Sequence, residues 1–267
     1  MLAEQHLRDG NLAECLNVLH EQIRNDPSDS RYRIFLFQLL CVLGDWDRAS
    51  TQLDVLKDLE ASAFPMVQTY REVLKCEILR EAVFSGKQSP TVFGDPQRWM
   101  ALLMEALRLT VQQEFSKALE LRQQALELAP VTSGTVDGVP FSWVADADSR
   151  LGPVLEVIIN GTYYWVPFDQ ISEIDIEQPE DLRDFVWAPA HFIWTNGGET
   201  VGLIPSRYPG SETSDDSQIR LARKTEWLEP SPNYFEGLGQ RIITTDSEEF
   251  SLLDARTIQL NSVARTE

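Results

Sequence analysis

Histidine and cysteine, the residues that most often bind metals or act as nucleophiles, are few and widely separated in this chain. The histidines are His6, His20 and His191, and the cysteines are Cys15, Cys41 and Cys76. No HxxxH, HExxH or CxxC spacing occurs, so the usual sequence patterns of metal-ligand pairs are missing. The cysteines fall in apolar, helix-like stretches, where a thiol usually behaves as a small hydrophobic side chain. We therefore predict no metal site and no Cys/His nucleophile.

Closely spaced carboxylates could in principle support general acid and base catalysis. Pairs occur at Asp146/Asp148, Asp175/Glu177, Glu180/Asp181, Asp215/Asp216 and Glu248/Glu249. A chain with 42 Asp and Glu contains such pairs by composition alone, and acid–base work needs surroundings that separate the two pKa values. The chain also lacks a GxGxxG, a phosphate-binding loop and a GxSxG. We predict no cofactor and no enzymatic activity, and a hydrolase that uses the acidic pairs is the least favoured alternative.

The charge of the chain excludes some classes of partner. The formal net charge is −19 and the sequence pI is about 4.5, so there is no basic footprint for a nucleic acid or an anionic membrane surface. The negative charge is concentrated in the second half of the chain. Residues 1–130 contain 14 Lys and Arg and 19 Asp and Glu, whereas the remainder contains 9 Lys and Arg and 23 Asp and Glu. An acidic surface of this kind either keeps the protein soluble or steers a basic protein partner.

Cysteine usage and hydropathy indicate the compartment. Three cysteines in helix-like stretches fit a reducing environment better than a disulfide framework. The first residues, MLAEQHLRDGN, contain no basic segment followed by an apolar run, and no window approaches the length of a membrane-spanning helix. We predict a cytoplasmic protein.

Several of the few cations in the second half lie beside Gly, Pro or Trp. They are Arg150, Arg183, Arg207 and the pair Arg223-Lys224. An arginine in an acidic region most often forms an internal ion pair that fixes a loop. The alternative is a patch for a protein partner, because Arg, Trp and Tyr dominate the energetics of protein interfaces.

The strands of the second half can be predicted from the sequence. The clearest signal is in residues 150–168, RLGPVLEVIINGTYYWVPF. Runs at 154–159 and 162–167 are rich in β-branched and aromatic residues, and Asn160-Gly161 between them favours the type I′ turn of a two-residue hairpin. Further strands are predicted near 141–144, 171–176, 191–195 and 200–204, with others after residue 219. Many short strands with tight turns favour a strongly curved or barrel-like sheet.

The first 130 residues show helical periodicity and a repeat. Gly10 and Gly44 are 34 residues apart, which is the period of tetratricopeptide helical hairpins. A partial third match runs from Phe115 to Pro130, with Gln113 in place of the glycine. A longer helix is predicted over 65–84, and Asp95-Pro96 is a favourable helix start.

These patterns together predict an α+β chain of two modules. Residues 1–130 form tetratricopeptide-like helical hairpins, and they pack on a barrel-like α+β domain of residues 140–267. We interpret residues 131–139 as a linker, because the stretch TSGTVDGVP at 132–140 is small, flexible and turn-rich.

The motifs RLGPVLEVIINGTYYWVPF, DLRDFVWAPA, LIPSRYPGS and LARKTEW, in this order after helical repeats, resemble the ImpE family. This family, also called TagJ, comprises accessory proteins of type VI secretion systems. The resemblance implies a two-module fold without enzymatic activity. It also implies a partner, the small subunit of the contractile sheath, which is bound through its N-terminal helix, with the ring ATPase that recycles sheath as a functional neighbour.

An adaptor of this kind would hold an amphipathic helix in an apolar groove. The candidate groove residues are Tyr32, Phe35 and Leu39 on the second predicted repeat, and Trp165, Trp187, Arg207 and Tyr208 on the sheet. Taken singly, each aromatic residue is more simply explained as core. The competing function is that of a chaperone or adaptor for a secreted effector, and co-purification with an effector instead of sheath subunits would favour it.

Overall fold

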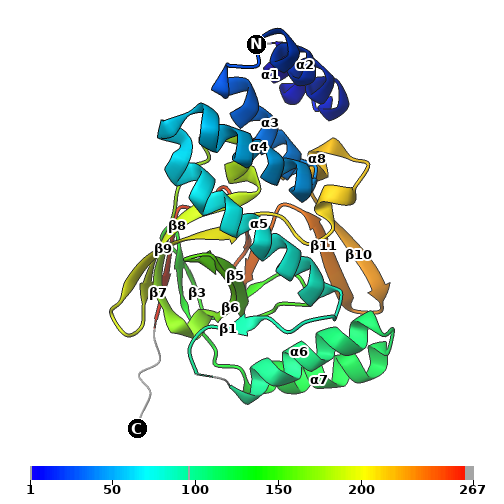
Figure 1. Cartoon of the computed structure of the whole chain (residues 1–267). Coiled ribbons are helices and arrows are strands. Elements are labelled where there is room, and N and C mark those ends of the chain that lie inside the picture. Colours follow the sequence, from blue (N-terminus) through cyan, green and yellow to red (C-terminus); the bar gives the residue numbers. More distant parts are fainter. Residues whose placement is uncertain (1, 96, 262–267) are drawn as a thin grey trace.

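The computed structural model describes residues 2–95 and 97–261, and it places N-terminal helices over one end of a large mixed sheet (Figure 1). The helices are α1 (Leu2–Arg8), α2 (Leu12–Asn25), α3 (Ser30–Val42), α4 (Trp46–Leu59), α5 (Phe64–Phe84), α6 (Arg98–Val111), α7 (Phe115–Leu128) and the short α8 (Ser217–Arg220). Contacts pair α1 with α2, α3 with α4 and α6 with α7. No described helix is long and apolar enough to cross a membrane.

Turn chemistry explains where the paired helices begin. Gly10 and Gly44 have φ of +77° and +71°, a conformation that glycine adopts without steric penalty. The next residues, Asn11 and Asp45, accept hydrogen bonds from backbone N–H groups in the first turns of α2 and α4. Gln113 has φ +63° at the corresponding turn before α7. The 34-residue spacing therefore marks real turns, and the tetratricopeptide assignment itself stays a prediction.

The start of α6 differs slightly from the prediction. The N-cap residue is Gln97 instead of Asp95, and no side-chain hydrogen bond caps this helix. Pro96, which we expected at the first helical position, lies outside the described residues.

The main sheet has nine strands in the order β1-β6-β5-β9-β8-β7-β14-β2-β3. Their bounds are β1 (Thr91–Val92), β2 (Gly134–Val136), β3 (Val139–Phe141), β5 (Val154–Ile159), β6 (Thr162–Pro167), β7 (Ile171–Ile176), β8 (Trp187–Trp194), β9 (Glu199–Pro205) and β14 (Thr257–Leu260). The β1–β6 pair is parallel and the other pairs are antiparallel. Strands β5, β6 and β7 have the predicted bounds.

Two smaller sheets complete the fold. Strands β4 (Val144–Asp146), β12 (Ile242–Thr245) and β13 (Glu249–Ser251) form one, in the order β13-β12-β4, and β10 (Thr225–Ser231) pairs with β11 (Tyr234–Gly239) in the other. The barrel-like shape predicted from the sequence is not found in the described residues. Closure would require the edge strands β1 and β3 to pair, and the nine-stranded sheet remains open between them.

The predicted linker is also built differently. Strand β2 and the start of β3 occupy this segment, and β2 pairs with β14 in the main sheet. A Cβ on Gly134 would lie 2.0 Å from the carbonyl oxygen of Gln259. This glycine therefore permits close approach of two strands, where the sequence suggested flexibility.

The central hairpin forms as predicted. Strands β5 and β6 pair from Val154↔Pro167 to Ile159↔Thr162, and Asn160 and Gly161 have φ of +49° and +73°. These are the two positive φ angles that a type I′ turn requires.

One face of this hairpin joins the helices to the sheet. A continuous hydrophobic cluster runs from α2–α6 to Tyr163, Trp165 and Trp187. The ring of Tyr70 in α5 lies 5.6 Å from that of Trp187 between centroids, and α5 crosses the sheet in Figure 1. A second cluster fills the opposite face. The helices and the sheet consequently share a core.

Candidate partner-binding site

Five of the seven predicted partner-contact residues are buried. Trp165, Trp187, Tyr208 and Leu39 have 0% exposure and Arg207 has 4%, so none offers surface to a partner in this structure. Tyr32 and Phe35 in α3 are half-buried. Of the predicted set, these two remain available for contact at the surface.

The buried residues surround an ion network that the sequence analysis did not find. Glu156, in the middle of β5, accepts hydrogen bonds from Arg80 Nε at 2.7 Å and Nη2 at 3.0 Å, and it also pairs with Arg241. The hydroxyl of Tyr163 donates to Glu156 Oε1 at 2.5 Å, and Trp165 Nε1 donates to that hydroxyl at 2.7 Å. The network therefore fixes α5 to the central hairpin.

Neighbouring carboxylates complete the network. Arg241 also pairs with Asp146 of β4. Glu77, one turn before Arg80 in α5, accepts a hydrogen bond from Trp187 Nε1 at 2.6 Å. Two of the predicted surface aromatics, Trp165 and Trp187, thus donate hydrogen bonds inside the protein.

The surroundings give the two carboxylates beside Arg241 different pKa values. Burial alone would raise the pKa of Glu156, but the cations Arg80 and Arg241 hold it at about 2. Burial raises the pKa of Asp146 to about 6 in spite of Arg241, and the nearby Asp148 carboxylate adds to this rise. Separated pKa values can mark an acid–base pair, so the accessibility of the oxygens decides whether this pair could act on a substrate.

Those oxygens are occupied by internal contacts. Asp146 Oδ1 accepts from the Asp148 N–H and the Tyr208 hydroxyl, and Oδ2 pairs with Arg241. Asp148 accepts from Arg150 Nε and Nη2 at 2.9 and 2.6 Å and from the Gly237 N–H at 2.8 Å. The predicted acidic pair Asp146/Asp148 therefore holds β4, β11 and the 147–150 turn together.

Arg207 joins the sheet to the end of α3. Its guanidinium, with 4% exposure, donates to the carbonyl oxygens of Val42 at 2.8 Å and Cys41 at 3.2 Å, and to that of Arg220. Carbonyls in the last turn of a helix lack intrahelical partners and carry partial negative charge, which a buried cation satisfies. Burial lowers the pKa of Arg207 to about 10. This arginine has the internal role that the first interpretation of the cations predicted, although carbonyl oxygens take the place of carboxylates.

The other singled-out cations also make internal contacts. Arg150 binds Asp148, Arg183 binds Asp181 at 2.6 Å, and Arg223 donates to the carbonyl oxygen of Arg8 at 3.1 Å. Their positions beside Gly, Pro and Trp correspond to turns that these contacts stabilise.

Charged residues in apolar stretches would have pointed to the buried network. Glu156 interrupts the run VLEVII, and Glu77 and Arg80 lie three residues apart in α5. A buried carboxylate needs a cation, but the partners Arg80 and Arg241 are 76 and 85 residues from Glu156 in the sequence. The sequence shows the need for a cation without showing which one supplies it.

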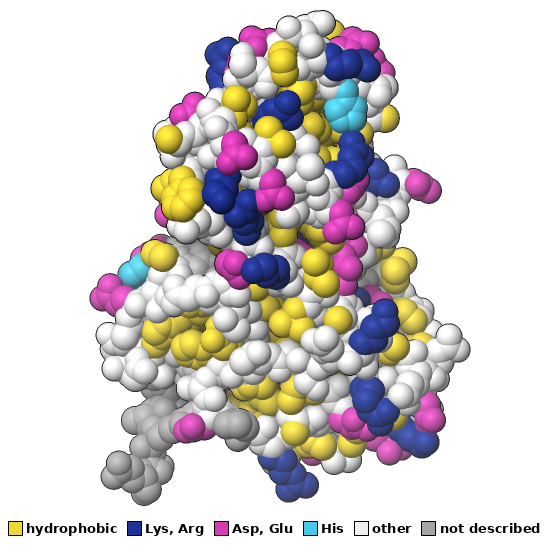
Figure 2. All heavy atoms as spheres, viewed as in Figure 1, with side chains coloured by type: hydrophobic (Ala, Val, Ile, Leu, Met, Phe, Trp, Pro, Cys, Tyr) yellow, Lys and Arg dark blue, Asp and Glu magenta, His cyan; other side chains and the backbone are white. Residues whose placement is uncertain are grey.

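The exposed surface contains a groove where α2, α3 and α4 meet, which we call the α2–α4 groove. Its volume is about 480 Å³, and it is lined by His20, Ile23, Arg24, Arg33, Leu36, Arg48, Thr51 and Gln52. In Figure 2, Lys, Arg and His side chains gather along the upper right edge, over the N-terminal helices. Of its three arginines, Arg24 pairs with Glu21 at 3.9 Å and Arg48 with Asp45 at 3.0 Å.

The electrostatics of this groove favour an anionic partner. Arg33 donates to Gln52 Oε1 at 3.3 Å and to the Pro27 carbonyl oxygen at 3.4 Å, and no carboxylate of the described residues lies within salt-bridge distance of it. Burial, together with the nearby cations Arg48 and Arg24, lowers the pKa of His20. Ile23 and Leu36 give the same groove an apolar component.

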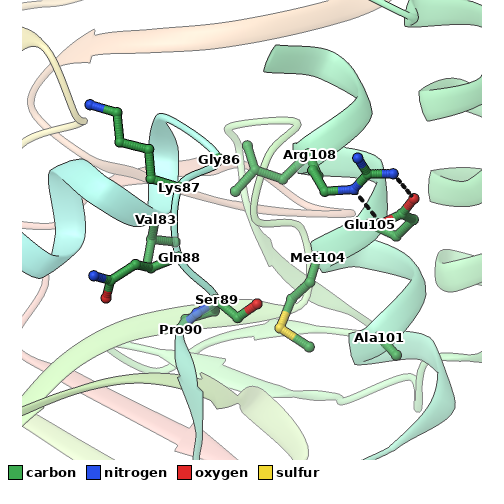
Figure 3. A pocket seen from close by; sticks show the side chains of 11 residues that line it. Val83, Gly86, Lys87, Gln88, Ser89, Pro90, Ala101, Met104, Glu105 and Arg108 are labelled. Carbon is green, nitrogen blue, oxygen red and sulfur yellow. Dashed lines mark hydrogen bonds and ion pairs between the residues drawn. The ribbon is translucent and has the colours of Figure 1, made fainter. Parts of the chain in front are cut away.

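A second hollow lies between α6 and the loop that follows α5, with a volume of about 430 Å³. Figure 3 shows Met104 pointing from α6 toward Ser89 and Pro90, while Glu105 and Arg108 pair with each other on the rim. Lys87 points away from that ion pair. The charges of Glu105 and Arg108 on this rim therefore compensate each other.

The architecture defines an α+β protein whose N-terminal helices share a core with a large mixed sheet, and comparison with known proteins identifies its family. The ImpE family model matches residues 138–259. The chain is 48% identical over 260 residues to a Pseudomonas aeruginosa protein described as type VI secretion system accessory component TagJ, covering 97% of this chain and 90% of that protein. The chain therefore belongs to the ImpE/TagJ family, as its motifs predicted.

A solved structure has the same fold. The crystal structure of protein VPA1032 from Vibrio parahaemolyticus matches with a TM-score of 0.90 and 26% sequence identity, over 100% of both chains. The arrangement of helices and sheet is consequently shared along the whole chain.

Proposed function

We propose that this chain is a non-enzymatic accessory protein of a type VI secretion system and acts in the cytoplasm. The observation that carries the proposal is the 48% identity with TagJ over nearly the whole chain. The saturated contacts of the buried carboxylates support a structural role for them.

Its partner in this proposal is the N-terminal helix of the small sheath subunit, and the α2–α4 groove is the binding site. An amphipathic helix would place apolar side chains on Ile23 and Leu36 and acidic side chains near Arg33 and Arg48. Tyr32 and Phe35 on α3 would supply additional contact beside the groove. Binding there would modulate sheath assembly or the recycling of sheath by the ring ATPase.

The two-module description accompanies this proposal. Residues 1–130 would act as a tetratricopeptide-like binding module and residues 140–267 as its support, joined by the shared core. A ligand on the helices could then affect the position of the sheet through the shared core and through contacts such as that of Arg207 with the end of α3.

Co-purification with charge-reversal variants tests the proposal. The chain is co-expressed with the full-length small sheath subunit, and complex formation is measured by size-exclusion chromatography. We expect co-elution with the wild type and its loss in Arg33→Glu/Arg48→Glu. The matched control is Arg31→Glu, because Arg31 is exposed on the same helix and lies outside the groove. Co-elution with an effector and not with the sheath subunit would contradict the proposal.

A further inference from the structure

A third hollow, between α7 and β4, contains a buried cation without a carboxylate partner. This α7–β4 cleft has a volume of about 440 Å³ and is lined on the helix side by Leu119, Arg122, Leu126 and Ala129. Trp143, β4 and the turn after it form the other side. Helix α7, which lines the cleft, lies at the far end of the molecule from α2 in Figure 1, and the cleft shares no lining residue with the α2–α4 groove.

Arg122 is 7% exposed, and no Asp or Glu of the described residues lies within salt-bridge distance of its guanidinium. Its Nε has no hydrogen-bond partner in the described structure, and Nη2 reaches only Thr110 Oγ1 at 3.4 Å. The ring of Tyr234 lies 4.4 Å from the guanidinium carbon, and the Tyr234 hydroxyl is also without a partner. Burial lowers the pKa of Arg122. A buried cation of this kind is energetically unfavourable unless a negative charge or a hydrogen-bond acceptor pairs with it.

The carboxylates near the cleft do not form an ion pair with Arg122. Asp146 pairs with Arg241, and Asp148 and Glu236 pair with Arg150, so Asp148 and Glu236 act on Arg122 only from beyond salt-bridge distance. Arg122 consequently remains as the cation that a ligand could satisfy.

The rim of the cleft is apolar and exposed. Leu126, Val131 and Trp143 are 49%, 67% and 41% exposed. Along α7 the lining extends from Leu119 to Ala129, which corresponds to about 15 Å of helix. About five residues of an extended chain cover the same length.

We propose that the α7–β4 cleft binds an extended segment of a partner protein in which an Asp or Glu lies between apolar side chains. The carboxylate binds Arg122, and the apolar side chains cover Leu126, Val131 and Trp143. This inference rests on the proposed adaptor function and gives the protein a second docking site, at the opposite end from the first. A two-site adaptor can hold two partners at once.

Selection from a phage-displayed library of random heptapeptides tests the site. The library is panned on the immobilised full-length chain after depletion on Arg122→Leu. We expect enrichment of peptides with one acidic residue flanked by apolar ones. No enrichment, or enriched peptides that lack an acidic residue, would overturn the proposal.

A double-mutant cycle on the most enriched peptide tests the predicted contact. Fluorescence anisotropy should show at least tenfold weaker binding for Arg122→Leu and for the peptide with its acid changed to the amide, without further loss when both changes are combined. Leu126→Asn on the exposed rim should also weaken binding, which guards against a folding effect of Arg122→Leu. Lys117→Leu is the control, since Lys117 is an exposed cation of α7 outside the cleft.

Further results would overturn the peptide assignment or separate it from the proposed function. Additive losses in the cycle, or 1:1 binding of sodium decanoate in the absence of any peptide hit, would overturn the peptide assignment. Binding of the sheath-subunit helix should be unchanged in Arg122→Leu, so failure of this inference is distinguishable from failure of the proposed function.

Discussion

Replacing Glu156 with Met should destabilise the protein more than any surface substitution. Glu156 has 0% exposure and is the carboxylate between Arg80 and Arg241. Its removal leaves Arg80 near Glu77 alone, at 3.4 Å, and leaves Arg241 with Asp146. It also removes the acceptor of the Tyr163 hydroxyl. Breaking a buried ion pair from one side lowers the free energy of unfolding by about 3–5 kcal/mol.

Urea unfolding followed by tryptophan fluorescence and circular dichroism measures this effect. The midpoint should fall while the slope of free energy against urea stays the same, because the native and unfolded surfaces change little. Glu249→Met is the control: Glu249 is an exposed strand residue, so the change should be within about 0.5 kcal/mol.

A double substitution separates the effect of unbalanced charge on stability from the effect of lost packing. Arg80→Met/Glu156→Met removes one cation and one anion and leaves the Arg241–Asp146 pair intact. We expect this double variant to be more stable than Arg80→Met alone, because Arg80→Met leaves both Glu77 and Glu156 short of a cation. A loss below about 1 kcal/mol for Glu156→Met, or a double variant less stable than Arg80→Met, would refute the assignment of Glu156 as the centre of the network.

Three other predictions concern the same junction. Asp146 has a folded pKa of about 6 against 3.8 when unfolded, so its stabilising contribution, about 3 kcal/mol, is complete below pH 3.8 and is lost as pH rises through 6; urea unfolding from pH 4 to 7 should show most of this fall in the wild type and a flatter profile in Asp146→Asn. Arg207→Met should lower the melting temperature by about 6–10 °C, since about 3 kcal/mol of buried hydrogen bonds to helix α3 is lost; an unchanged melting temperature would contradict this role. Gly237→Ala should destabilise by about 1–3 kcal/mol in urea, because the new Cβ would lie 2.2 Å from the Tyr208 ring, and a neutral result would show that Tyr208 can move.

Local chemistry made part of the fold predictable. Asn160-Gly161 determines its own turn, and the glycines at 10 and 44 determine where helices end, because positive φ angles are favoured by few residue types. Strands β5, β6 and β7 could likewise be located from residues that are adjacent in the sequence.

Properties that depend on distant residues were not predictable. Whether a sheet closes depends on its edge strands, here β1 and β3, which lie about 50 residues apart. The sequence around Gly134 is typical of a linker, and the requirement for glycine there arises from the neighbouring strand β14, which is distant in the sequence. Trp165 and Trp187, which were proposed for a partner, are buried, and they donate hydrogen bonds to Tyr163 and Glu77. Arg122 gave no signal of its own, since its isolation is apparent only once α7 and β4 are in position.

The most direct test of the central claim is a calorimetric titration of the full chain with a peptide of roughly 20 residues from the N-terminus of the small sheath subunit. The account predicts one peptide per chain, micromolar or tighter affinity, a negative heat-capacity change from apolar burial, and at least tenfold weaker binding to Arg33→Glu but not to Arg31→Glu. An absence of binding, or equal affinity for both variants, would contradict the assignment of the α2–α4 groove as the sheath-binding site.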